Sequence, residues 1–175
     1  MERSFFTARQ YMSDDLKFKH PFSCIVSGRR GSGKSSFCIS FLQNREHLCT
    51  ERAFAGGLVW CYGEKSVVAT RHQLPANIRI NEGVPEDVGS ANEPPCLVIL
   101  DDFLTDVYSK EVCELFTRGS HHRNISVILI NQNLLCQGRF CRDIFLNAHY
   151  IVALKMSEIR NSSCSWPVKC TPKLG

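Results

Sequence analysis

The feature that most constrains this chain is an eight-residue stretch in which three glycines are interspersed with polar residues and a lysine. Glycines let the backbone turn so that successive N–H groups point at one anion, with no Cβ in the way. The lysine can reach phosphate oxygens, and the serine that follows it can bind Mg²⁺. The stretch fits the P-loop pattern G-x-x-x-x-G-K-[ST], and its predicted nucleotide-binding residues are Gly28, Arg29, Arg30, Gly31, Ser32, Gly33, Lys34 and Ser35.

The segments on either side of the loop support this interpretation. Residues 22–27 predict a short buried strand, and residues 36–42 carry apolar pairs at helical spacing. Strand, glycine-rich loop and helix in this order form the setting that a P-loop requires. A helix that begins here also directs its positive dipole end at a bound phosphate. We therefore predict that the cofactors are ATP and Mg²⁺, with Ser35 as a metal ligand.

A second informative stretch is the apolar run 96–100, which is followed directly by two aspartates. Such a run is typical of a central parallel strand that delivers carboxylates to the carboxyl edge of a sheet. Asp101 is expected to hold Mg²⁺, largely through water, and Asp102 to orient or deprotonate the attacking water. The alternative is a simple Asp-Asp turn after a strand.

The predicted strand 125–130 ends in three consecutive amides. An amide at the carboxyl end of a strand beside the acidic strand can sense the γ-phosphate or hold the lytic water. Gln132 is the favoured catalytic candidate, with Asn131 and Asn133 as weaker ones. Turn formation by these polar residues is the alternative.

Composition sets the class of protein. The chain has 175 residues, of which 43% are hydrophobic and 22% charged, which suits one soluble domain with a sizeable core. No apolar run approaches membrane-span length, and the N-terminus lacks the apolar core of a secretory signal. We expect an intracellular protein, in the nucleus or cytoplasm of a host cell, with no membrane partner.

The ten cysteines are expected to be reduced, buried thiols, because no secretory signal accompanies them. Zinc binding by Cys136, Cys141, His121 and His122 is an alternative whose spacing matches no standard pattern. The net charge of +4 is compatible with a polyanionic partner, and basic residues gather at 29–30, at 118–123, and at 139 with 142.

Several stretches together resemble a known family: residues 97–102, 115–127, 130–134, 137–139 and 146–152. They are similar to the poxvirus-type DNA-packaging ATPases of the FtsK–HerA superfamily, and especially to copies in Polinton/Maverick-type elements and related viruses. The resemblance covers about residues 16–155 and is most specific in residues 120–134.

This resemblance implies a RecA-like α/β P-loop NTPase, with a mostly parallel central sheet and helices on both faces. It implies a homo-oligomeric ring that hydrolyses ATP to translocate double-stranded DNA into a capsid. Gln132 matches the family's glutamine after its fourth strand. The resemblance also suggests an arginine finger that acts across subunits, with Arg123 and Arg118 as candidates and Arg139 as a weaker one.

The expected organisation is a lead-in over 1–20, a P-loop ATPase domain over 21–155, and an unstructured tail over 156–175. Further strands are expected at 58–62, 78–80 and 149–154, helices near 65–73 and 105–118, and a short helix or a lid over 138–146. Family members continue well past the last strand. Residues 156–173, back-translated and read one base earlier with synonymous codons, can encode a sequence similar to that continuation. We therefore hypothesise a truncated chain with a frameshifted, protease-sensitive tail and apolar surface exposed beside the last strand.

Three functional hypotheses follow. The first is an ATPase motor for DNA packaging. The second is a small P-loop kinase, which is disfavoured because Asp101, Asp102 and Gln132 form a water-activating set and no arginine-rich lid follows. The third is an inactive, element-derived remnant that at most binds nucleotide, which the tail supports.

Overall fold

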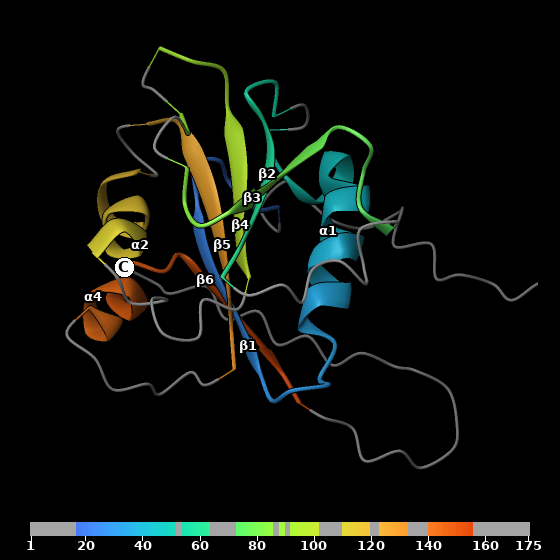
Figure 1. Cartoon of the computed structure of the whole chain (residues 1–175), viewed down its shortest axis with the longest axis vertical. Helices are drawn as coiled ribbons and strands as arrows, with labels where there is room; N and C mark the ends of the chain where they lie inside the picture. The colour runs from blue at the N-terminus through green and yellow to red at the C-terminus, as the bar shows by residue number, and fades with distance from the viewer. Residues whose placement is uncertain are drawn as a thin grey trace, which may run out of the picture.

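The computed structural model describes residues 17–51, 54–63, 73–85, 88–89, 92–101, 110–119, 123–132 and 140–155. The described chain alternates strands and helices and forms an α/β fold (Figure 1). Its elements are β1 (Ser23–Gly28), α1 (Lys34–Leu48), β2 (Gly57–Tyr62), β3 (Ile78–Glu82), β4 (Cys96–Asp101), α2 (Lys110–Glu114), the π-helical segment η4 (Leu115–Gly119), β5 (Ile125–Asn131), α4 (Cys141–Leu146) and β6 (Tyr150–Leu154).

The strands form one six-stranded sheet in the order β3-β2-β4-β5-β1-β6, and every pair is parallel. The strand before the glycine-rich loop, β1, therefore lies between β5 and β6. The acidic strand β4 lies on the other side of β5. Because all strands run the same way, their carboxyl ends meet at one edge of the sheet.

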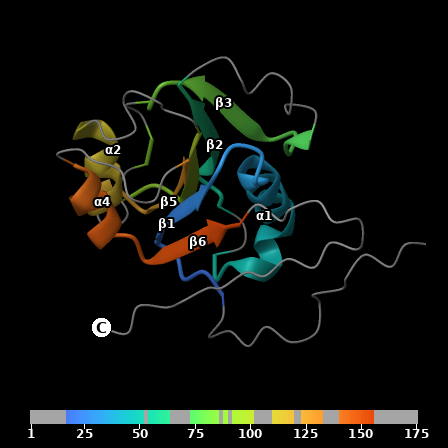
Figure 2. The ribbon, with the colours of Figure 1, turned by 90° about the horizontal axis from the view of Figure 1, so that it is seen from below.

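The apolar strands are buried on both faces, as continuous apolar runs predict. Alternate side chains of β4 enter two separate cores. Leu97 and Ile99 belong to a cluster with α1 residues such as Leu42, whereas Val98 belongs to a cluster with Phe116. Figures 1 and 2 show α1 on one side of the sheet and α2 with α4 on the other. The predicted parallel sheet with helices on both faces is confirmed.

The end of the expected lead-in is packed into the fold. The Phe18 N–H donates to Leu48 O at 2.8 Å, and the Thr50 N–H donates to Phe18 O at 3.0 Å, which ties this segment to the end of α1. The Phe18 ring lies 5.3 Å from Phe22 and 4.6 Å from Tyr150, measured between centroids. The Phe18 ring also lies 5.0 Å from Phe41 of α1, so the aromatic cluster joins β6, α1 and the residue before β1, and its edge-to-face and tilted contacts add to area burial.

Two histidine–serine contacts hold the amino edge of the sheet. His20 bonds Ser126 Oγ through Nδ1 at 2.7 Å and Asn124 Oδ1 through Nε2 at 2.8 Å. His149 Nδ1 accepts the Ser23 N–H at 3.0 Å. These side chains satisfy buried polar groups where β1, β5 and β6 begin, so all three strands start from fixed positions.

The predicted elements agree with the structure to within a residue or two for the strands. The weak strand at 78–80 is β3, and the helix expected to end near 118 is present as α2 followed by η4. That helix closes with a π-helical turn, which the apolar spacing did not predict. The helix expected at 65–73 lies almost wholly outside the described residues, and the tail lies fully outside them.

The apolar surface expected beside the last strand is not seen among the described residues. Val152 and Leu154 of β6 are buried, and Tyr150 and Ile151 are half-buried. The exposed large apolar side chain of the described chain is Leu146 of α4.

The described cysteines are buried thiols, which confirms the prediction for them: Cys24, Cys38, Cys49, Cys61, Cys96, Cys113 and Cys141. Burial raises the pKa of Cys49 and Cys61 to about 12 and that of Cys96 to about 11. These thiols are therefore small hydrophobic groups, protonated at neutral pH, and weak nucleophiles.

We expect the free energy of unfolding to fall as the pH rises above about 8.5, where thiols of the unfolded chain ionise. A thiol whose pKa is raised in the folded state makes its full contribution to the free energy of unfolding below the pKa of the unfolded chain. That contribution is lost as the pH rises toward the pKa of the folded state. Each such thiol contributes a slope of about 1.4 kcal/mol per pH unit. Denaturant titrations between pH 8 and 11 measure this slope, and Cys61→Ala should reduce it by one thiol's share. An unchanged slope in that variant would contradict the assignment.

Candidate nucleotide-binding site

The glycine-rich loop joins the end of β1 directly to the start of α1. Gly31 has φ 78° and Gly33 has φ 86°, values in the left-handed region that glycine adopts without strain. The Ser32 N–H donates to Arg29 O at 3.1 Å and closes a turn, and the Phe37 N–H donates to Gly33 O at 2.8 Å. Backbone N–H groups at the start of α1 are therefore available to an anion.

Gly28 is packed where the loop leaves the sheet. Its register partner in β6 is Leu154. A Cβ on Gly28 would lie 2.5 Å from Ser32 Oγ and 2.7 Å from Leu154 O. The first residue of the motif therefore has to be glycine for a steric reason, since the loop folds back over it against the edge strand.

The Lys34 side chain folds back along the loop. Its Nζ donates to Gly28 O at 2.7 Å and to Arg29 O at 3.1 Å. These bonds hold the ammonium across the loop, so a phosphate bound there would meet a positioned cation. Ser35, the predicted metal ligand, is half-buried in the same first turn of α1.

Ser32 carries a buried hydroxyl with no hydrogen-bond partner. The residue is 8% exposed. Leaving such a group unsatisfied costs about 1–3 kcal/mol. A phosphate oxygen in the loop is an acceptor that would satisfy it, so this buried hydroxyl fits a site built for an anion.

Asp101 lies at the same edge of the sheet as the loop. It is the last residue of β4 and is 9% exposed. In the register of the sheet, Asp101 pairs with Ile130 of β5, and Ile130 pairs with Val26 of β1. Two strand spacings, about 10 Å, therefore separate its strand from β1. Burial and then the Cys24 and Asp101 charges raise the pKa of Cys38, which lies one helical turn after Lys34. The Asp101 carboxylate is thus near enough to Cys38 of α1 to contribute to the raised pKa of that thiol.

The carboxyl end of β5 lies between the loop and Asp101. Ile128 and Ile130 of β5 pack in the cluster on the α1 face, whereas Leu129 packs in the other cluster. Continued alternation places Gln132 on the α1 face and Asn131 on the opposite face, beside Ser27. Gln132 is exposed just beyond the strand. Gln132, the favoured catalytic candidate, therefore lies on the same face of the sheet as α1, the helix that begins at the loop.

Some predicted residues lie outside the described part of the chain: Asp102, Asn133, Arg139 and the zinc candidates Cys136, His121 and His122. The backbone of Arg118 belongs to η4, and its side chain is not described. Arg123 is exposed and precedes β5, at the amino edge of the sheet. By the pairing of β1 with β5, nine residues or roughly 30 Å separate it from the loop along the strand, so it could act as an arginine finger only on another subunit.

Within the described ranges, no three His, Cys, Asp or Glu side chains are grouped as metal ligands. A Mg²⁺ site at a P-loop needs no such cluster, because phosphates and water supply most of its ligands. One serine hydroxyl and one carboxylate, as in Ser35 and Asp101, are the donor types that suit it.

Sequence reasoning missed one residue at this edge. Lys155 directly follows Leu154 and is exposed beside the start of the loop. The local sequence pattern gives no sign that Lys155 lies beside the loop, because its position depends on the pairing of β6 with β1.

No protein-family model matches the chain, and no curated protein is significantly similar to it. Among the described helices, none is long and apolar enough to cross a membrane.

We expect Gly28→Ala to lower the free energy of unfolding by about 1–3 kcal/mol, the usual cost of overpacking. It should also weaken nucleotide binding, because relief of the clash requires movement of Ser32 or of β6. Thermal unfolding and nucleotide titration measure the two effects. Ser36→Ala, an exposed change in the first turn of α1, is the matched control and should alter neither. A Gly28→Ala protein with the parent's stability and affinity would refute the packing argument.

Proposed function

We propose that this chain is the ATP-binding and ATP-hydrolysing domain of a motor related to viral double-stranded-DNA packaging ATPases. The observation that carries the proposal is the arrangement at the carboxyl edge of the sheet. The loop after β1 and the Asp101 carboxylate at the end of β4 flank the polar end of β5. A RecA-like P-loop domain needs these three parts in this neighbourhood.

In this proposal each group has a definite task. N–H groups of the loop and the Lys34 ammonium bind the β- and γ-phosphates, and the Ser32 hydroxyl gains the acceptor that it lacks. Ser35 and Asp101 hold Mg²⁺, which when bound neutralises charge on the phosphate oxygens. Asp102 orients or deprotonates the attacking water, and Gln132 helps to hold it.

Water is favoured over another acceptor because of what lies beside the γ-phosphate position. The strand between β1 and β4 ends in Asn131 and is followed by Gln132, and β4 ends in Asp101, after which Asp102 comes next in the sequence. Carboxylates can take a proton from water, and an amide can both donate to it and accept from it. A kinase that shares the loop would instead transfer the phosphoryl group to a small acceptor.

Double-stranded DNA and a ring of identical subunits are the proposed partners. Both rest on the sequence resemblance, and the net charge of +4 is compatible with a polyanion. The place of Arg123 at the edge opposite the loop suits a role in a neighbouring subunit's site. Binding to DNA backbone phosphates would weaken with salt and be nearly independent of sequence.

The deciding experiment measures ATP turnover by the purified protein, with and without double-stranded DNA. We expect DNA-stimulated hydrolysis in the parent, and strongly reduced MgATP affinity in Lys34→Ala, because that change removes a cation from a polyphosphate site. Phosphoryl transfer to a small acceptor would favour the kinase, and absence of nucleotide binding would favour the remnant. Parent-like MgATP binding by Lys34→Ala in calorimetry would overturn the site itself.

Residues at the ends of β4 and β5 are expected to serve hydrolysis more than binding. Asp102→Asn should slow turnover by about 100-fold or more while ATP still binds, the scale for loss of a general base. Gln132→Ala should also lower turnover, whereas Asn131→Ala, its neighbour on the opposite face, should leave turnover close to the parent once folding is verified. If Gln132→Ala and Asn131→Ala lowered turnover equally, the assignment of the two amides to opposite faces with different roles would be rejected.

A further inference from the structure

We propose that Lys155, outside the P-loop motif, is a nucleotide-binding residue that acts on the phosphate nearest the ribose. The inference rests on the proposed function and names a residue of that same site. It follows from the neighbour relations of β6, from the distribution of charge at the carboxyl edge, and from the order of strands there.

The first step is position. β6 pairs with β1 over its full length, and Leu154 is the register partner of Gly28. Lys155 is therefore one residue beyond the sheet, level with Arg29, the first residue of the loop. Neighbouring strands are about 4.8 Å apart, so its backbone lies within a side chain's reach of the loop. The backbones approach closely here, because a Cβ built on Gly28 would lie 2.7 Å from Leu154 O.

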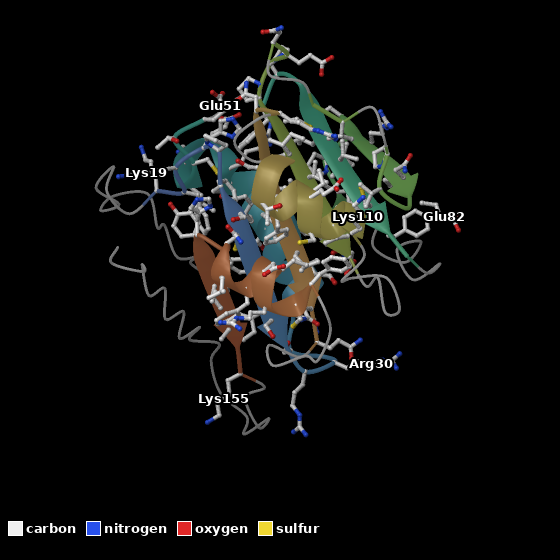
Figure 3. All side chains as sticks on the ribbon, turned by 90° about the vertical axis from the view of Figure 1, so that its left-hand side faces the viewer. Lys19, Arg30, Glu51, Glu82, Lys110 and Lys155 are labelled. Carbon is white, nitrogen blue, oxygen red and sulfur yellow. The ribbon has the colours of Figure 1, made fainter. Side chains whose placement is uncertain are left out.

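The second step is charge. Arg29, Arg30 and Lys155 are exposed, and none of them has an acidic partner in the described chain. Figure 3 shows Arg30 and Lys155 projecting at one end of the molecule, with Lys19 and Glu51 at the other. The described acid nearest in strand order is Asp101, on the far side of β5. Among the described residues, these three basic residues therefore place unpaired positive charge beside the proposed anion-binding loop.

The third step is the direction of the nucleotide. Asp101, the proposed metal ligand, lies on the β5–β4 side of the loop, so the metal and γ-phosphate belong on that side. β6 lies on the opposite side of β1. The remainder of the nucleotide, from the α-phosphate to the ribose, therefore extends toward β6. Lys155 then meets a part of the ligand that ATP and ADP share.

This placement separates Lys155 from the residues that serve hydrolysis. Its removal should weaken MgATP and MgADP by the same factor and raise KM, with kcat unchanged. Solvent screens the charge of an exposed cation, so the affinity for either nucleotide should fall by only about fivefold at low ionic strength. It should shrink toward nothing near 1 M salt, where the Debye length is about 3 Å.

The test titrates MgADP and MgATP into the parent and into Lys155→Gln, Lys155→Glu and Lys155→Arg, at low and high salt. We expect nucleotide affinity to be lower in Lys155→Gln than in the parent and lowest in Lys155→Glu. Lys155→Arg, which keeps the positive charge, should bind like the parent. Lys19→Glu, an exposed charge reversal at the other end of the molecule, is the control for net charge and should bind like the parent. Thermal unfolding verifies that every variant is folded.

The outcomes are separable. A parent that binds no nucleotide would overturn the proposed function, whatever the variants do. A parent that binds, with Lys155→Glu equal to it at low salt, would overturn only the role of Lys155. Equal losses in Lys155→Glu and Lys19→Glu would assign the effect to net charge and reject the local site. A loss confined to MgATP would also overturn the proposal, because it would place Lys155 on the γ-phosphate.

Discussion

The parallel pairing of β1 with β5 on one side and β6 on the other is the constraint on which the site depends. Side chains alternate along each strand, so a slip of one residue in any pair would move its side chains to the opposite face. In the observed register, Asp101 follows Leu97 and Ile99, which pack on the α1 face. A slip in β4 would turn the carboxylate away from the helix that begins at the loop. Precise register is thus a chemical requirement here, and the two apolar cores enforce it.

Polar groups at the carboxyl edge are held in an apolar frame. Asp101 is 9% exposed, and Ser32 is 8% exposed with an unpaired hydroxyl. An unpaired buried hydroxyl costs stability, so the Ser32 hydroxyl suits a place where a ligand completes the pairing. The amino edge is different, because His20, Ser126, His149 and Ser23 satisfy one another there. At the amino edge these polar side chains bond to one another. At the carboxyl edge, the loop suits an anion and the Asp101 carboxylate suits a cation.

Local pattern predicted much of this structure. The strand, loop and helix around Lys34 were predicted because each depends on neighbours within a few residues, and so were the apolar strands β4 and β5. Strand order was not predicted, since it depends on crossovers between distant segments. Contacts that follow from strand order were missed for the same reason: the packing of Gly28 on Leu154, the position of Lys155, and the histidine contacts of the amino edge. The π-helical turn of η4 also had no signal, because it differs from an α-helix in hydrogen bonding and not in apolar spacing.

The edge strand gives the site a particular dependence. Among the described strands, β6 pairs only with β1, and it is five residues long. A short strand with one neighbour has few ladder bonds of its own, so its place relies on side-chain packing. That packing comes from the Phe18, Phe22 and Tyr150 rings and from the close approach of Leu154 O to Gly28. The loop in turn folds over Gly28. The conformation of the loop and the docking of β6 are therefore one coupled feature, and an anion that orders the loop also stabilises the edge of the sheet.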